Sequence, residues 1–331
     1  MKIKLLLFNT LLLFINVNSV KAQVLFNDDF DNHNIALLSN DATGNTSGQG
    51  NWFVTVNNSS YEANVDSESN KGNVLGVHTK SSTINSQVNY VQQKQLATLW
   101  NARTAGNNIL KLEFDFYIYS MVFSKGSGGG IGFNLNLNDI QGNNIALLNC
   151  AIVENGDLVV NGTKINGVTG ITWAKTEMFI DYNTNNVFYY IPSLNYSNFV
   201  SITNLNQSVD EMLISFDINK VIVVGGGAIR FDNFEMSALQ TLPTYLSVDE
   251  FISEKLNVYP NPTNNIVNLI SSDDIVINEI VVYDLSGKKL KNILYNYAKE
   301  VQINIEDLAE GVYLLDIKTN KGITQKKIIK K

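Results

Sequence analysis

Residues 109–119 constrain the fold most, because apolar and polar side chains alternate strictly along them. One face of this stretch is apolar and consists of Leu112, Phe114, Phe116 and Ile118. The other face is polar and consists of Lys111, Glu113, Asp115, Tyr117 and Tyr119. A period of two is typical of a β-strand with one buried face. Such a strand predicts an antiparallel sheet that packs against a second layer.

Short apolar segments of the same kind recur through residues 23–237. Alternation continues over residues 131–137, and Asn155-Gly156 and Asn161-Gly162 are typical of hairpin turns. A helix-like pattern occurs only over residues 94–106. Many short strands joined by Gly and Asn turns predict an all-β sandwich for this part of the chain.

The cysteine count and the net charge limit which metals and ligands that sandwich can bind. Cys150 is the single cysteine, which excludes an internal disulfide framework and a cysteine-based zinc site. Residues 23–254 contain 22 acidic and 10 basic side chains, whereas residues 255–331 contain 9 acidic and 11 basic ones. An acidic domain disfavours nucleic acids and polyanionic glycans as electrostatic partners. Neutral glycans and calcium remain compatible with it.

The first 22 residues have the pattern of a secretory signal peptide. Lys2 and Lys4 precede a mostly apolar run over residues 5–17, and Val20-Lys21-Ala22 offers a small-residue cleavage site. A membrane anchor over residues 5–17 is the alternative. No later run reaches the 18 apolar residues that a spanning helix needs, so we expect no membrane span in the mature chain. The leader predicts passage through the periplasm.

The last quarter of the chain forms a second predicted unit over residues 255–331, after a linker over 238–254. Its strand-like segments predict a small Ig-like β-sandwich. Its motifs are a Pro-Asn-Pro entry, two turn glycines, an apolar Val-Tyr-Leu-Leu strand and a lysine-rich end. The residues concerned are Pro260, Asn261, Pro262, Gly287, Gly311, Tyr313, Lys326, Lys327 and Lys330. We expect the glycines to relax tight turns and the terminal lysines to stay solvated.

In this order, these motifs resemble the type A C-terminal sorting domain of the type IX secretion system of Bacteroidota. The resemblance implies recognition by the outer-membrane secretion machinery. It also implies removal of the tail by a sortase-like peptidase, which leaves the cargo secreted or attached to the outer-membrane surface.

The cargo over residues 23–237 carries shorter motifs near its two ends. Asp28-Asp29-Phe30 and Gly50-Asn51-Trp52 lie near the start, and Phe231-Asp232-Asn233-Phe234 lies near the end. Together they resemble motifs of concanavalin A-like and carbohydrate-binding jelly rolls, in which the first and last strands are neighbours. That resemblance implies a structural calcium at this edge, with oxygen ligands from Asp29, Asp31 and Asp232. The alternative is that these aspartates are solvated turn residues.

Aromatic and acidic side chains on strand faces predict a glycan-binding surface. The candidates are Asp115, Tyr117, Tyr119 and Tyr189. Flat rings can stack on a sugar ring, and neighbouring polar groups can bind its hydroxyls. The alternative is that these tyrosines are ordinary packing residues under loops.

The sequence supports a catalytic site less well than a glycan-binding surface. Glu113 and Asp115 share one strand face, as in laminarinase-like glycoside hydrolases, but Tyr117 stands where that family has a third acid. An alginate-lyase-like site needs His and Tyr beside basic residues, and His33 and His78 are the only histidines. We assign no catalytic residue. The sequence favours a non-catalytic glycan-binding module, with a polysaccharide hydrolase or lyase, or a structural adhesive protein, as alternatives.

Overall fold

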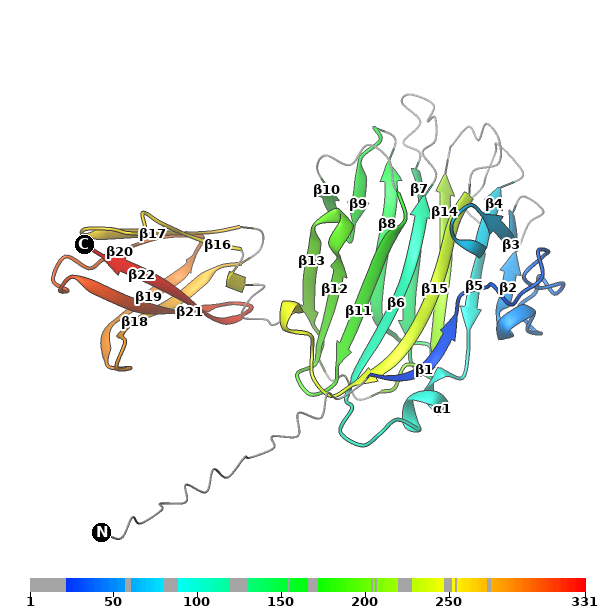
Figure 1. The fold of residues 1–331 in the computed structure, drawn as a ribbon, viewed down its shortest axis with the longest axis horizontal. Helices are drawn as coiled ribbons and strands as arrows, with labels where there is room; N and C mark the ends of the chain where they lie inside the picture. Colours follow the sequence, from blue (N-terminus) through cyan, green and yellow to red (C-terminus); the bar gives the residue numbers. More distant parts are fainter. Residues whose placement is uncertain are drawn as a thin grey trace, which may run out of the picture.

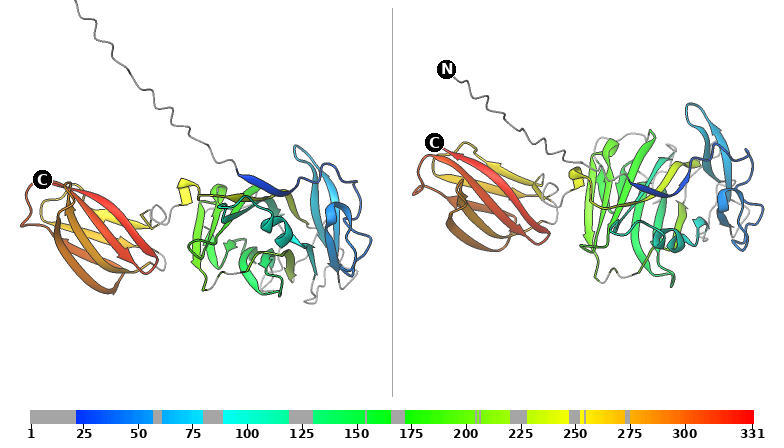
Figure 2. Two further views of the ribbon diagram at one scale, coloured as in Figure 1. Left: turned by 90° about the horizontal axis from the view of Figure 1, so that it is seen from below. Right: turned by 60° about the horizontal axis from the view of Figure 1, so that its bottom comes forward.

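The computed structural model describes residues 22–56, 61–79, 89–118, 130–153, 155–165, 172–203, 205, 207–219, 228–246, 252–253, 255–272 and 275–331. Two β-sandwiches with separate cores follow one another along this chain (Figures 1 and 2). Tyr119 and residues 1–21 of the predicted signal peptide lie outside the described residues. Within the described residues, none of the helices has the length and apolarity needed to cross a membrane.

The first sheet of the cargo, called sheet A here, contains eight antiparallel strands. They run in the order β13-β12-β11-β6-β15-β4-β3, and β1 pairs with β15. The strands are β1 Gln23–Asp28, β3 Tyr61–Glu68, β4 Gly72–Thr79, β6 Ile109–Ile118, β11 Ala174–Asp181, β12 Asn186–Ile191, β13 Tyr196–Ser201 and β15 Ala228–Leu239. The pairing of β1 with β15 makes the first and last cargo strands neighbours, as the jelly-roll resemblance implies.

The second sheet, called sheet B here, contains seven strands and packs against sheet A. Its order is β10-β9-β8-β7-β14-β5-β2. The strands are β2 Phe53–Val56, β5 Asn89–Gln93, β7 Gly130–Asn138, β8 Asn144–Val153, β9 Leu158–Val160, β10 Thr163–Ile165 and β14 Glu211–Asn219. The described helical segments of the cargo and of the segment that follows it are short: η1 Gln49–Asn51, α1 Leu96–Asn101, η2 Pro192–Leu194 and η3 Thr244–Leu246.

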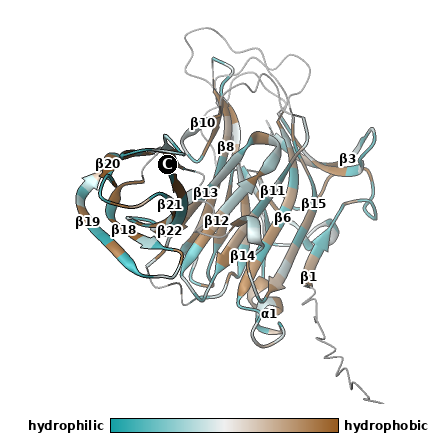
Figure 3. Cartoon of the chain, turned by 60° about the vertical axis from the view of Figure 1, so that its left-hand side comes forward, coloured by the Kyte–Doolittle hydropathy of each residue, from teal (hydrophilic) through white to brown (hydrophobic). Residues whose placement is uncertain are grey.

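The strict alternation of residues 109–118 places one side of β6 in the core between the sheets. Phe114 packs against Phe133 of sheet B and stacks on Phe234 of β15. Polar side chains of β6 point to the outer face of sheet A. The hydropathy colouring of the strands changes from residue to residue accordingly (Figure 3). These features confirm the predicted all-β jelly-roll sandwich.

The segment predicted to be a linker, residues 238–254, is packed at both ends. Strand β15 continues to Leu239, and Leu246 is buried on the outer face of sheet A against Phe179, Phe188 and Phe199. At the other end, Ile252 is buried in the core of the tail. Apolar side chains spaced irregularly along 239–252 explain why the sequence pattern did not reveal this packing.

The tail folds as a smaller two-sheet sandwich, as predicted. One sheet has the order β16-β17-β20 and the other β19-β18-β21-β22. The strands are β16 Leu256–Tyr259, β17 Ile266–Ser271, β18 Ile277–Asp284, β19 Lys289–Ala298, β20 Glu300–Asn304, β21 Gly311–Thr319 and β22 Gly322–Lys330. Buried Val, Ile and Leu side chains of both sheets form its core.

Candidate functional site

The outer face of sheet A carries a band of charged and aromatic side chains, called the ion-pair face here. Its strands contribute alternate residues, because only every second side chain points away from the core. The β3–β4 turn adds Lys71. The face comprises Lys71, Lys111, Glu113, Asp115, Tyr117, Trp173, Lys175, Glu177, Asp232 and Asn233. Asp115 and Tyr117 therefore lie on the outer face, where the alternation of β6 puts them.

Two carboxylates of this face share the same two donors. Lys71 Nζ lies 2.5 Å from Asp115 Oδ2 and 3.3 Å from Asp232 Oδ2. Asn233 Nδ2 donates to the same two oxygens, at 2.9 Å and 3.0 Å. Asn233 adopts φ +54° at a bulge in β15, and bulges re-aim side chains in this way. The shared donors hold both carboxylates close together.

Asp232 is 1% exposed, and burial raises its pKa to about 6, with Asp115 adding to the shift and Lys71 opposing it. A raised pKa means that the folded state binds a proton more tightly than the unfolded state. The resulting stabilisation is present below about pH 4 and is lost as the pH rises through about 6. We expect Asp232→Asn to remove this pH dependence, so between about pH 4 and pH 7 the wild type should lose up to about 3 kcal/mol more stability than the variant. Urea unfolding at both pH values measures it; equal losses in the two proteins would contradict the assignment.

Glu113 lies at the centre of a second cluster. It is paired with Lys111, and Lys175 Nζ lies 3.1 Å from its Oε1. Lys111 also contacts Glu177 Oε1 at 2.8 Å. Burial alone would raise the pKa of Glu113, but the bonds and charges of Lys111 and Lys175 outweigh it and hold the pKa below its ordinary value. A general acid needs the opposite shift, so this environment does not suit the acid of a glycoside hydrolase.

The aromatic part of the face is formed by Tyr117 of β6 and Trp173, the residue that precedes β11, where Ala174 pairs with Phe116. Their ring centroids lie 5.9 Å apart with the planes at 43°. Both side chains are half-buried. Lys71 Nζ lies 4.6 Å from the centre of the Trp173 ring, so one ammonium connects the aromatic pair to the carboxylates.

A pocket of about 290 Å³ opens beside this group, where β1 meets the bulge of β15. Carboxylates and amides dominate its polar lining, with one lysine. These polar residues are Asn27, Asp28, Asp29, Glu113, Asp115, Lys175, Asn233 and Glu235. Such a lining offers many acceptors and several donors to a hydroxylated ligand.

Tyr189 does not belong to this face. It is 4% exposed and lies in the core between the sheets, whereas its neighbour Tyr190 points outward and contacts Tyr245. Placing Tyr189 on the ligand-facing surface was therefore wrong. Strand β12 has buried side chains on both faces. Tyr189 lies in the core between the sheets, and Phe188 on the outer face is covered by Leu246. Tyr119 lies outside the described residues.

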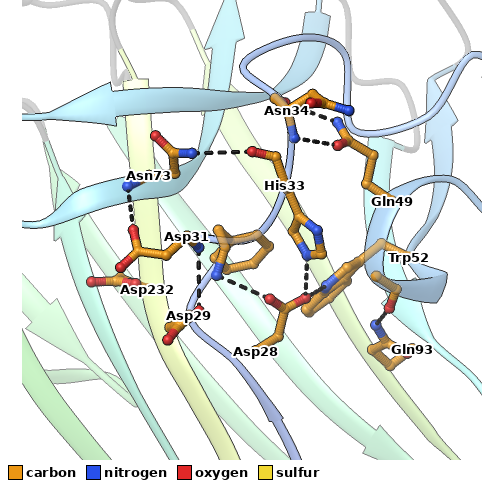
Figure 4. A network of polar contacts seen from close by, with 12 residues as sticks. Asp28, Asp29, Asp31, His33, Asn34, Gln49, Trp52, Asn73, Gln93 and Asp232 are labelled. Atoms are coloured by element: carbon orange, nitrogen blue, oxygen red, sulfur yellow. Dashed lines mark hydrogen bonds and ion pairs between the residues drawn. The ribbon is translucent and has the colours of Figure 1, made fainter.

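The Asp-Asp-Phe motif has a clear structural role through Asp28 (Figure 4). Its Oδ2 accepts hydrogen bonds from Trp52 Nε1 at 2.8 Å and from His33 Nε2 at 2.9 Å, and its Oδ1 accepts from the backbone N–H of Phe30 at 2.9 Å. Gly50 passes so close that a Cβ there would lie 2.5 Å from Asp28 Oδ2. The two N-terminal motifs thus meet to anchor the buried Trp52.

The three aspartates expected to bind calcium have other partners. Asp29 Oδ1 accepts from the N–H of Asp31, Asp31 Oδ1 accepts from the N–H of Asn73 at 2.7 Å, and Asp232 is paired with Lys71. Among the described residues, no group of three or more His, Cys, Asp or Glu side chains is placed to hold a metal ion. An ammonium group beside Asp232 also opposes a cation there, so these residues do not fit the implied calcium site.

In the tail, the sorting motifs come together on the terminal strand β22. Asn261 Nδ2 donates to the carbonyl of Lys327, and Asn261 Oδ1 accepts from the N–H of Ile329, both at 2.9 Å. The Pro260-Asn261-Pro262 entry is therefore fixed to the C-terminal end. Tyr313 is buried, and its hydroxyl donates to the carbonyl of Ala309 at 2.6 Å.

Two expectations about the tail motifs need correction. Lys330 is 9% exposed rather than solvated, because its ammonium enters the loop that follows β20. Lys327 is exposed and Lys326 half-buried. Gly287 does adopt a turn conformation with φ +82°, but Gly311 is simply the first residue of β21 and pairs with Lys330.

The site also contains residues that the sequence alone did not single out. Lys71, Trp173 and Asn233 come from three segments far apart in the chain and meet only across the sheet. The Asp232-Asn233 pair was visible as a motif, but its partner Lys71 had no local signal.

Comparison with known families identifies the tail and leaves the cargo unassigned. Residues 257–331 match the model of the secretion system C-terminal sorting domain, which confirms the type IX sorting-domain prediction for the tail. This tail indicates export by the type IX system to the cell surface or the medium. No curated protein matches the chain in sequence.

Solved structures with a similar arrangement of strands include both enzymes and binding modules. A sialidase matches 62% of this chain at 10% identity with a TM-score of 0.39, and the chain spans only 19% of it. The CBM22-1 xylan-binding domain of Paenibacillus barcinonensis Xyn10C matches 68% of this chain and 99% of its own length, at 11% identity and a TM-score of 0.29. A family 7 alginate lyase matches 57% of this chain and 85% of its own, at 8% identity and a TM-score of 0.33. Likeness at this level carries no argument about the chemistry of this chain.

Proposed function

We propose that the cargo is a non-catalytic glycan-binding module that the sorting tail delivers to the cell surface or the medium. The observation that carries this proposal is the Tyr117–Trp173 pair beside the polar pocket of the ion-pair face. A sugar ring needs an apolar surface for its C–H face and fixed polar groups for its hydroxyls. Both lie here within one continuous group of contacts, because Lys71 touches Trp173 and Asp115.

Each part of the face has a role in this proposal. Tyr117 and Trp173 provide the stacking surface, and Asp115 and Asn233 bind hydroxyls at the mouth of the pocket. Lys71 orients Asp115 and lies over the indole, so it sets the position of the ring that the ligand meets. Tyr119 follows Tyr117 on the same side of the sequence alternation, and we include it as an extension of the stacking surface.

The export route completes the proposal. The leader over residues 1–22 takes the chain into the periplasm, and the type IX machinery of a member of the Bacteroidota recognises the tail. A sortase-like peptidase then removes the tail. Because Leu246 belongs to the outer face of the cargo, removal after this residue leaves the cargo fold intact.

The stacking surface is tested by binding of glycans to the full chain. We expect Trp173→Ala and Tyr117→Ala each to weaken binding about tenfold, which corresponds to roughly 1.4 kcal/mol. A glycan array identifies the ligand, and calorimetry with that ligand measures the change. Tyr297→Ala removes an exposed tyrosine from the tail, outside the proposed site, and serves as the control.

Two results would overturn the proposal. One is the absence of saturable binding across neutral and acidic glycans. The other is shortening of a polysaccharide by the chain together with loss of that activity in Glu113→Gln, which would establish the hydrolase alternative.

A further inference from the structure

The outer face of sheet B is chemically unlike the ion-pair face on the opposite side of the sandwich. Its central strands β5, β14, β7 and β8 present no charged side chain at seven neighbouring positions. These positions form what is called the amide platform here: Tyr90, Asn134, Asn136, Leu147, Asn149, Leu213 and Ser215. Charged residues border it: Glu211 precedes and Asp217 follows the two platform positions in the alternation of β14, and Lys164 lies on the edge strand β10.

The register of the strands arranges the platform in two rows. Tyr90, Ser215, Asn134 and Asn149 lie opposite one another in the first row, and Leu213, Asn136 and Leu147 in the second. Directly paired residues of antiparallel strands share a face. At roughly 4.8 Å between strands, the first row of four is about 14 Å long and the second row of three about 10 Å, and the rows lie about 7 Å apart. All seven side chains are half-buried or exposed.

Hydrogen bonds within the platform and from the neighbouring Asn144 fix which amide atoms are left for a ligand. Asn149 Nδ2 donates to Asn134 Oδ1 at 2.7 Å, and Asn144 Nδ2 donates to Asn136 Oδ1 at 2.9 Å. The amide nitrogens of Asn134 and Asn136 and the amide oxygen of Asn149 are the atoms left for a ligand. Two donors, one acceptor, the Ser215 hydroxyl and the Tyr90 ring thus face solvent in a fixed pattern.

We propose that the amide platform is a second binding surface, for a neutral polysaccharide chain lying across the strands. A hydroxyl both donates and accepts, so it matches outward-pointing amides of both kinds, and Tyr90 with Leu213 and Leu147 receives the apolar faces of the rings. A charged polymer finds no partner at these seven positions. This absence of charge is distinctive in a cargo with 19 acidic side chains over residues 23–237.

A second copy of this chain fits the platform less well. A stable dimer buries about 800 Å² on each partner around an apolar centre. The seven positions offer no apolar centre of that kind, because five of the seven side chains are amides or carry hydroxyls.

The test is electrophoresis of the full chain in native gels that contain hydroxyethyl cellulose or a galactomannan, with alginate as the charged comparator. The double variant Asn134→Asp, Asn136→Asp keeps both oxygens that accept internal bonds and replaces only the outward amide nitrogens. We expect it to weaken retardation by the neutral polymers about tenfold. The control carries the same charge change at Asn292 and Asn296, two exposed residues of β19 in the tail.

Three outcomes would overturn the inference. They are equal retardation of the double variant and the wild type, retardation by alginate alone, and a concentration-dependent dimer that the double variant abolishes. The Trp173→Ala variant separates the two faces. If it removes all retardation and the double variant removes none, the ion-pair face binds and the platform does not; the converse supports the platform and contradicts the proposed site on sheet A.

Discussion

Replacing Lys330 with methionine is expected to lower the free energy of unfolding of the sorting tail by about 3 kcal/mol. Its ammonium donates to the carbonyls of Ile305 and Glu306, each at 2.8 Å, and of Leu308 at 2.5 Å. Methionine keeps the length of the side chain and removes all three bonds. The carbonyls are then left without their charged donor in a place that water reaches poorly, which is the costly way to lose a hydrogen bond.

A loss of this size is large for so small a unit. A domain of about 75 residues has a free energy of unfolding of roughly 4–11 kcal/mol, so the tail would lose a large part of its stability. We therefore also expect less cargo at the surface and in the medium, and more in the periplasm. Denaturant unfolding measures the first effect, and cell fractionation measures the second. A chain ending before residue 255 gives the reference for complete retention.

Lys327→Met is the matched control, since Lys327 is exposed on the same strand. It should leave tail stability within about 0.5 kcal/mol of the wild type. Unchanged stability of the Lys330 variant would show that the three bonds contribute nothing. Lower stability with normal export would show instead that sorting does not depend on the folded end of β22.

The position of Lys330 illustrates what the sequence of the tail could and could not reveal. The composition of the terminal lysine run predicts a solvated basic end. It carries no information about the carbonyl groups that Lys330 contacts, which belong to a loop more than 20 residues earlier in the chain. The strands around it were predictable from alternation and turn glycines. The penetration of one lysine into the loop depends on how β22 and the end of β20 are placed in space.

In the cargo too, local sequence patterns predicted some side-chain positions correctly, and contacts with distant parts of the chain decided others. Strict alternation over β6 was enough to place Asp115 and Tyr117 on the outer face, because only one of its two faces is apolar. The same rule failed at Tyr189, since both faces of β12 are buried, one in the core and one beneath Leu246. Period-two patterns assign faces only where burial differs between them.

The polar motifs near the cargo termini were recognisable, but their physical role was not. A cluster of aspartates beside the first and last strands resembles a calcium site in composition. In the fold, each carboxylate is instead matched to a particular donor: Asp28 to an indole, Asp31 to a backbone amide and Asp232 to an ammonium. Pairings between residues so far apart in the chain are set by the tertiary fold.

Asp28→Ala is expected to lower the stability of the cargo by about 3 kcal/mol. The change leaves the indole N–H of the fully buried Trp52 and the backbone N–H of Phe30 without their acceptor. Trp52 also packs against Phe30 and Phe234, so a displaced indole disturbs the junction of β1 with β15. For a domain of about 200 residues, this loss corresponds to a decrease in Tm of roughly 6–12 °C.

The neighbouring aspartate provides the control for this variant. Asp29 is exposed, and its carboxylate accepts a bond only from the nearby N–H of Asp31, so Asp29→Ala should change stability by less than about 0.5 kcal/mol. Calorimetry of both variants measures the difference, and tryptophan fluorescence reports whether Trp52 becomes exposed. Equal Tm values for Asp28→Ala and Asp29→Ala would mean that the motif does not act through the indole. A large loss in the first variant alone would establish that the paired N-terminal motifs exist to hold Trp52 in the core, whatever ligand the outer faces bind.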